Sequence, residues 1–314
     1  MFTSIWEDIK REFNYGNTVS RIILVNIGVF LLINIVWVIL RISNGWVTPP
    51  AYEKIVQFLS ISSSVRHNLT HIWVFITHMF LHEGFFHLFF NMLMLYYFGR
   101  IVGDFIGNHR VLPLYLLSGI AGALMFFLTV NFLPYGGGNL HFALGASAAV
   151  MGIVLAAGVL SPDYIFYLPL LGAVKIKYII AVMLIVDFFA VAGNTNTGGH
   201  FAHLGGALFG WIFVRQLRKG QDLSVWVNRL IYSITLLFKP DSRKQERKGP
   251  YMVYKNQDKK KTATRKQEKS KPHHTSDNLS HEEQVDSILD KIKEKGYESL
   301  TPEEKEFLFN ASKK

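Results

Sequence analysis

Long apolar runs are the feature that most constrains the fold of this chain. Six runs of about 20 residues, each with few charges, are long enough to cross the hydrocarbon core of a bilayer. They cover residues 21–41, 84–104, 111–132, 141–160, 173–193 and 199–217. A lipid-exposed segment of this length must satisfy its own backbone hydrogen bonds, so each run is expected to be a helix. The pattern predicts an all-α polytopic membrane protein built around a six-transmembrane-helix bundle.

Basic residues indicate how the six spans are oriented. If the N-terminus is cytoplasmic, most Lys and Arg residues near the span ends fall on the cytoplasmic side, and the outer side receives only Arg41, Lys54 and Arg66, all in its first loop. Because positive charge accumulates in cytoplasmic loops, both termini are predicted to be cytoplasmic. The first run lacks the small-residue cleavage pattern of a signal peptide, so it is counted as a span.

Cysteine content and charge exclude several classes of function. The chain has no cysteine, which rules out disulfides, thiolate metal sites and a cysteine nucleophile. Its formal charge of +10 lies mostly in the C-terminal tail. The basic clusters flank apolar runs and lack a nucleic-acid-binding motif, so membrane lipids are the expected partner and nucleic acid is not. Short inner loops and the lack of cysteine favour a bacterial inner membrane.

The segments outside the spans differ in character. The outer loop over residues 42–83 carries two short apolar stretches, 51–60 and 72–81, which we expect to be interfacial or partly embedded. Near the C-terminus, Ser280 with Glu283 and Thr301 with Glu304 have the spacing of helix capping boxes. The predicted parts are a cytosolic N-terminal segment (1–20), a six-span core (21–218), an amphipathic inner-surface helix (219–240), a basic disordered linker (241–276) and a small helical hairpin (277–314) whose packing partner is unknown.

Polar residues inside the spans are costly and are functional candidates by default. Six are found, at His87, Asn91, Ser147, Asp187, His200 and His203. The second, fourth and sixth spans all run inward under the predicted topology. At about 1.5 Å per residue, Ser147 lies roughly 9 Å and His203 roughly 6 Å below the start of their spans. His87 and Asn91 also lie in the first two turns of theirs, so these four residues are predicted at one depth near the outer face.

Small residues favour contact between the fourth and sixth spans. Gly206 and Gly210 follow His203 at spacings of three and seven, and Gly145 opens a second run of small residues around Ser147. Such ridges let two helices approach closely in a membrane. The predicted consequence is that the Ser147 hydroxyl comes within reach of the His203 imidazole.

These residue types fit nucleophilic catalysis. A serine hydroxyl needs an adjacent base, for which histidine is the usual choice, and donors aimed at the developing oxyanion. His87 and Asn91 lie four residues apart on one helix face, so both can point into one cavity. Nucleophile, base and oxyanion donors are thus present without a cofactor or a metal.

The motifs HLFFN, GAS and AHLGGALFG, in this order on alternate spans, resemble those of the rhomboid family of intramembrane serine proteases. The resemblance covers roughly residues 21–217. It implies Ser147 as the nucleophile and His203 as the base of a dyad, with His87 and Asn91 as oxyanion donors. It also implies cleavage of single-span membrane proteins near the outer end of their helix. Two positions depart from the family pattern: Ala148 follows the serine, and Trp73 is followed by Val74 instead of arginine.

Three alternatives remain open beside the dyad. His200, His203 and His78 could form a metal site, although no membrane carboxylate is expected beside them, and His82 and His87 in HEGFFH are spaced wrongly for a helical metal pair. A catalytically inactive scaffold of the same fold could bind membrane helices without cutting them. Asp187 could orient His203 as the third member of a triad, but a hydrogen bond within the bundle or to water is the favoured interpretation.

Overall fold

The structure is a computed structural model that describes residues 2–168, 172–193, 195–238, 281–295 and 297–311. The chain divides into two compact units, residues 1–244 and 245–314. The first unit contains the apolar runs. The second contains the C-terminal helices.

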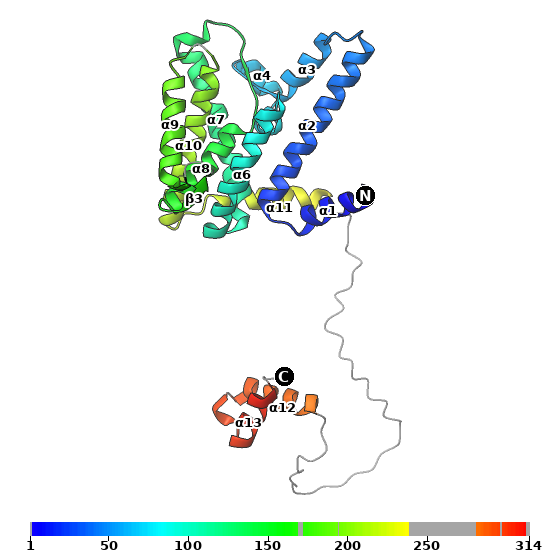
Figure 1. Ribbon diagram of the computed structural model, residues 1–314, viewed down its shortest axis with the longest axis vertical. Helices are drawn as coiled ribbons and strands as arrows, with labels where there is room; N and C mark the ends of the chain where they lie inside the picture. The colour runs from blue at the N-terminus through cyan, green and yellow to red at the C-terminus, as the bar shows by residue number, and fades with distance from the viewer. Residues whose placement is uncertain (1, 169–171, 194, 239–280, 296, 312–314) are drawn as a thin grey trace, which may run out of the picture. The chain divides into compact units, whose positions relative to one another are not determined.

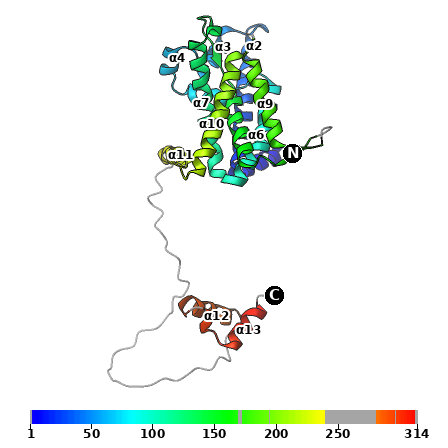
Figure 2. The same ribbon diagram turned by 90° about the vertical axis from the view of Figure 1, so that its left-hand side faces the viewer.

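Six helices of the first unit run alongside one another as a bundle (Figures 1 and 2). They are α2 (Thr18–Ser43), α6 (Phe85–Ile106), α7 (Val111–Phe132), α8 (Ser147–Leu160), α9 (Ile176–Ala190) and α10 (Thr197–Arg218). Three of the described helices are long and apolar enough to cross a membrane: α2, α6 and α7. The third of these spans also includes the 3₁₀ turn η2 (Asn108–Arg110), which directly precedes α7. The chain is therefore a mostly helical integral membrane protein.

The last three predicted spans are shorter or more polar than the first three. Helix α8 has 14 residues, because residues before it are extended and β2 (Phe142–Ala143) pairs with β1 (Ile61–Ser62). Helix α9 has 15 residues and follows an antiparallel pair, β3 (Ile165–Leu168) and β4 (Gly172–Lys175). The fold is mostly helical, as predicted, and these two strand pairs are its described β-structure. Hydropathy alone does not separate a short apolar strand from a buried helical turn.

The outer loop between α2 and α6 is folded, and its short apolar stretches are helical. It contains α3 (Pro50–Leu59), α4 (Val65–Thr70), α5 (Val74–Thr77) and the 3₁₀ turn η1 (His78–Phe80). Figures 1 and 2 show α3 and α4 at one end of the bundle. The indole Nε1 of Trp73 donates to the Phe58 carbonyl over 2.9 Å, so this tryptophan ties the loop to α3 without a following arginine.

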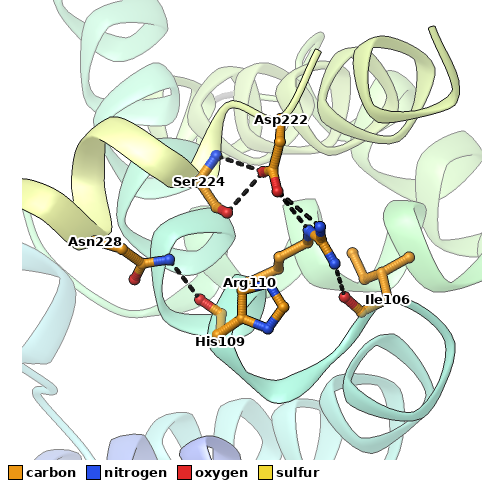
Figure 3. A network of polar contacts seen from close by, with 6 residues as sticks. All are labelled: Ile106, His109, Arg110, Asp222, Ser224 and Asn228. Carbon is orange, nitrogen blue, oxygen red and sulfur yellow. Dashed lines mark hydrogen bonds and ion pairs between the residues drawn. The ribbon is translucent and has the colours of Figure 1, made fainter. Parts of the chain in front are cut away.

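Two helices lie crosswise at the opposite end of the bundle, α1 (Phe2–Tyr15) and α11 (Ser224–Phe238) (Figure 1). The sequence predicted α11 but no helix within residues 1–20. Figure 3 shows how α11 is attached: Asp222 accepts from the backbone N–H and hydroxyl of Ser224 and pairs with Arg110 at 2.8 Å. Asn228 Nδ2 donates to the His109 carbonyl over 3.1 Å, and Arg110 also donates to the Ile106 carbonyl.

The centre of the bundle is the packing of α10 against α8 and α7. A Cβ atom at Gly206 would collide with the Ala148 carbonyl, and one at Gly210 would collide with the Gly152 carbonyl. The backbones of α8 and α10 are thus in direct contact, as the small-residue ridges predicted. The surrounding core includes the fully buried side chains of Tyr115 and Phe213.

The second unit consists of α12 (His281–Lys295), the 3₁₀ turn η4 (Tyr297–Ser299) and α13 (Pro302–Ala311). The predicted capping box at Thr301 is confirmed: its N–H donates to the Glu304 carboxylate over 2.8 Å, and the Glu304 N–H donates to its hydroxyl over 3.3 Å. Lys291 of α12 pairs with Glu304 at 2.7 Å. The predicted cap at Ser280 and the linker over 241–276 lie outside the described residues.

Candidate active site

Ser147 is the first residue of α8 and lies at a sharp change of backbone direction. Gly145, two residues earlier, has φ of +123°, a conformation that favours glycine. Its N–H donates to the His78 carbonyl over 2.8 Å, which holds the turn against the outer loop. The sequence placed Ser147 about 9 Å inside a helical span. Instead the helix begins at the serine, which leaves the first backbone N–H groups of α8 without intrahelical partners.

His203 lies in the second turn of α10 and faces the serine. Its Nε2 is 2.8 Å from the Ser147 Oγ, which is a hydrogen-bond distance for a nucleophile and its base. The imidazole is part-buried, with 20% of its side chain exposed. The residues that the sequence predicted at one depth therefore meet, through the close contact of α8 with α10.

Asp187 of α9 lies on the far side of the same imidazole. Its Oδ1 is 2.9 Å from Nδ1 of His203 and 2.7 Å from Nδ1 of His200. The carboxylate is buried, with 7% of the residue exposed. The sequence interpretation put Asp187 in an ordinary hydrogen bond, whereas the structure aligns Ser147, His203 and Asp187 in the order of a nucleophile, base and orienting carboxylate.

His87 and Asn91, in the first two turns of α6, line the same cavity as Ser147 and His203. Asn91 Nδ2 donates to the His87 carbonyl over 2.8 Å with one of its two N–H groups, so the other is available to a ligand. The position that a Cβ of Gly145 would take lies 3.1 Å from His87 Nε2 and 3.7 Å from Ser147 Oγ. The absence of a side chain at Gly145 leaves this space open between imidazole and hydroxyl.

Two further histidines support the site from the outer loop. His78 and His82 are both buried, at 4% exposure each. The backbone N–H of Ala146 approaches His82 Nε2 at 3.4 Å, and burial, helped by His87, lowers the pKa of His82 to about 4, so its ring is neutral and can accept. The rings of His82 and His87 lie 5.1 Å apart. A helix over residues 82–87 would keep these two rings apart, but α6 begins only at Phe85, so His82 is not on that helix.

A cavity of about 1210 Å³ opens in front of the serine. Its walls include parts of α2, α3, α6, α7 and α10, the start of α8 and the extended segment before it. Among the described residues, the cavity is lined by two carboxylates, Glu53 and Glu83, and by no lysine or arginine. No α9 residue lines it, whereas Asn34 and Trp37 of α2 do. The hollow that reaches the serine is therefore bounded by α2 and α3 and not by α9.

The methyl group of Ala148, which replaces the glycine of the family pattern, points toward α7. A Cβ at Gly122 of α7 would collide with this methyl group and would lie 2.8 Å from the Ala202 carbonyl. Gly122 therefore provides the space that the extra methyl group needs.

The ligand atoms of Asp187, His200 and His203 all lie within 4.8 Å of one another. The expectation that no carboxylate accompanies the membrane histidines is wrong, because Asp187 of the neighbouring helix α9 contacts both His200 and His203. This group of three could hold a metal ion, and it does not include His78.

Comparison with known proteins agrees with this architecture. Residues 69–219 match a family model described as the rhomboid domain, and residues 274–314 match a family of unknown function. A human presenilin-associated rhomboid-like protein of mitochondria is 27% identical over 240 residues, which cover 71% of this chain and 55% of that protein. Rhomboid-like protein 11 of Arabidopsis thaliana, a chloroplast protein, is 27% identical over 231 residues, covering 70% of this chain and 72% of that protein.

One relative is named as inactive. The inactive rhomboid-like protein 8 of Arabidopsis thaliana is 29% identical over 150 residues, 47% of this chain and 40% of that protein. The chain spans about half the length of the human relative. Because the two longer matches are named for mitochondria and chloroplasts, they give no support to the predicted bacterial inner membrane. The family model over residues 69–219 and these relatives together show that this chain contains a rhomboid domain.

Proposed function

We propose that this chain is an intramembrane serine endopeptidase that hydrolyses a peptide bond near the outer end of single-span membrane proteins. The observation that carries the proposal is the distance of 2.8 Å between Ser147 Oγ and His203 Nε2 at the wall of a large cavity. Serine and histidine within hydrogen-bond reach, with a carboxylate behind the histidine, are the parts that acyl transfer requires.

The proton path follows from the contacts of His203. Asp187 accepts from the Nδ1–H of His203, which leaves Nε2 as the nitrogen that accepts the serine proton. Ser147 Oγ then attacks the substrate carbonyl, and the imidazolium formed is stabilised by the carboxylate. His203 returns the proton to the leaving amine, and water repeats the sequence on the acyl-enzyme. Asp187 acts here as a positioning residue through His203.

The oxyanion of the tetrahedral intermediate needs donors that are fixed before the reaction. His87 Nε2, the second amide N–H of Asn91 and the backbone N–H of Ser147 are the proposed donors. His87 and Asn91 line the cavity, and Gly145 keeps the space between His87 and the serine free of a side chain. Each donor is expected to contribute about 2.7–4 kcal/mol to the transition state, the range measured for such groups elsewhere.

The membrane arrangement is part of the proposal. We place all six bundle helices across the bilayer, with both termini on the side of α1 and α11. Helix α8, at 14 residues, spans only about 21 Å of a hydrocarbon layer about 30 Å thick. If its C-terminal end lies near the inner face, its N-terminal serine lies below the outer face, where the cavity supplies water.

A second candidate function, a scaffold that binds membrane helices without cutting them, is favoured by the relative named as inactive. The two functions predict different reactivity at one atom. An activated serine reacts with a fluorophosphonate, whereas a serine that only packs two helices does not, whatever the substrate.

The test compares the purified wild-type protein with Ser147→Ala and His203→Ala in detergent with a metal chelator. Fluorophosphonate labelling and cleavage of a model single-span substrate are measured on each. We expect wild type to label and cleave and both variants to do neither. Folded wild-type protein that is not labelled would overturn the protease proposal in favour of the scaffold. Cleavage abolished by the chelator would overturn the serine mechanism.

A further inference from the structure

The cluster of Asp187, His200 and His203 contains one side chain, His200, that the protease mechanism does not use. His203 needs one hydrogen-bond acceptor at Nδ1, but the structure places a second histidine on the same carboxylate oxygen, at 2.7 Å. His200 does not contact the serine in any described hydrogen bond, so its position is not explained by acyl transfer. Two imidazole nitrogens from α10 thus approach one carboxylate oxygen from α9.

We propose that Asp187, His200 and His203 form a zinc-binding site whose occupation switches the protease off. The inference rests on the proposed function in naming His203 as the base, whereas zinc binding itself does not depend on it. One ligand atom from each of the three residues lies within 4.8 Å of the other two, and both Nδ1 atoms lie within 2.9 Å of the Asp187 Oδ1. Zinc takes histidine nitrogen at about 2.0–2.1 Å and carboxylate oxygen at about 2.0–2.2 Å, so small side-chain movements bring all three to one ion.

The arrangement of elements suits such a site. His200 and His203 lie three residues apart on α10 and therefore share a face. Asp187, on the last turn of α9, closes the site from the neighbouring helix. Two imidazoles and one carboxylate leave a fourth zinc position for water, and this ligand set favours zinc over magnesium or calcium, which prefer oxygen ligands.

Inhibition follows from the tautomer that the metal imposes. Zinc would take the Nδ1 lone pair of His203, so the single proton of the neutral imidazole must move to Nε2. An Nε2–H group donates to the serine and cannot accept its proton. The metal ion would thus take the place of the two Nδ1 protons, of His200 and His203, that point at Asp187. Ser147 would then lack its base, although neither α8 nor α10 changes position.

The experiment measures zinc binding and serine reactivity separately on the full-length protein in detergent. Zinc affinity is obtained by competition with a zinc-responsive dye, and inhibition by the dependence of fluorophosphonate labelling and substrate cleavage on free zinc, each relative to the zinc-free rate of the same variant. The variants are His200→Gln and Asp187→Asn, which change ligands but keep side-chain shape. The control is His67→Gln, because the rings of His67 and His71 stack at 4.5 Å and form a second histidine pair.

We expect wild type and His67→Gln to bind one zinc ion competitively with the dye and to lose labelling as it binds. His200→Gln and Asp187→Asn should bind zinc at least about tenfold more weakly, since even partners of metal ligands contribute 10- to 100-fold to affinity. In His200→Gln, the inhibitory zinc concentration should rise by the same factor. Equal zinc affinity in wild type and His200→Gln would overturn the site, and zinc binding without loss of labelling would overturn the switch. A wild type that binds zinc but never labels would refute the protease proposal and leave the metal site standing.

Discussion

The methyl group of Ala148 fills the space that Gly122 leaves open on the neighbouring helix α7. The residue after Ser147 is thus larger than the glycine of the family pattern, and the facing residue has no side chain. The two positions form a matched pair directly behind the serine.

This pair predicts a compensating double substitution. Gly122→Ala should destabilise the protein by about 1–3 kcal/mol, the usual cost of overpacking a core, and should impair cleavage by displacing α8. Ala148→Gly should retain cleavage and cost about 1 kcal/mol through lower helix propensity. Combining both should recover part of the stability lost in Gly122→Ala, as thermal unfolding in detergent would show. Strictly additive effects would contradict the contact.

The carboxylate behind His203 predicts a loss of rate without a loss of fold. Asp187→Asn should lower both cleavage and fluorophosphonate labelling by at least about tenfold, because an amide does not hold the imidazole in the required tautomer. Asp163→Asn is the matched control, since Asp163 is an exposed carboxylate paired with Lys175 and Lys177 outside the site. Wild-type labelling rates in Asp187→Asn, with unfolding unchanged, would show that the serine and histidine suffice.

The backbone contact between α8 and α10 predicts strong intolerance at Gly206. A methyl group there collides with the Ala148 carbonyl and separates Ser147 from His203. We expect Gly206→Ala to abolish labelling and to lower stability by about 1–3 kcal/mol. Gly28→Ala on α2 is the control, because nothing lies within 4 Å of its Cβ position and alanine favours the helix. Normal labelling in Gly206→Ala would contradict the packing.

The attachment of α11 predicts a dependence on acid. Burial would raise the pKa of Asp222, but hydrogen bonds from Ser224 and Arg110 outweigh it and hold the pKa below its usual value. A depressed pKa in the folded state means that the carboxylate stabilises the attachment above its ordinary pKa, and that this stabilisation is lost as pH falls through the lower value. Protection of α11 amides should therefore persist from pH 7 to pH 5 and decline only below about pH 4.

Hydrogen exchange, corrected for the intrinsic rate at each pH, measures this protection. Asp222→Asn should exchange faster in α11 at pH 7, whereas Asp104→Asn, at an exposed position on α6, should not. Unchanged exchange of α11 in Asp222→Asn would show that Asn228 and apolar contacts are sufficient.

The acidic lining of the cavity predicts a charge preference in substrates. Glu83 lines the cavity together with Tyr52, and burial and the nearby Glu83 carboxylate raise the pKa of the Tyr52 hydroxyl. A model substrate with lysine beside the cleaved bond should be cut faster than its glutamate counterpart. Glu83→Gln should reduce that ratio by up to about fivefold, the effect of one partly exposed ion pair. A ratio near one in wild type would contradict the preference.

The helical part of the fold and the serine–histidine pair were predictable because both depend on local pattern. Hydropathy marked α2, α6 and α7, and glycine spacing brought Ser147 to His203. The strand pairs at Ile61 and Ile165 depend on partners distant in sequence and carry no distinct hydropathy signal. The contact of Asp187 with both His200 and His203 was equally unpredictable from the sequence. The rotation of α9 about its axis is set by packing and not by its apolar pattern.

Because α8 begins at Ser147, the direction of the Ser147 hydroxyl depends on the number of residues in this helix. Each residue inserted into an α-helix turns everything before it by about 100° relative to everything after it. The contacts at Gly206 and Gly210 hold Ala148 and Gly152 in place, so a single insertion between Ala148 and Gly152 would rotate the Ser147 hydroxyl away from His203. Insertions before residue 141 would lengthen only the connection to α7. Variation in length is therefore expected on one side of the serine and forbidden on the other.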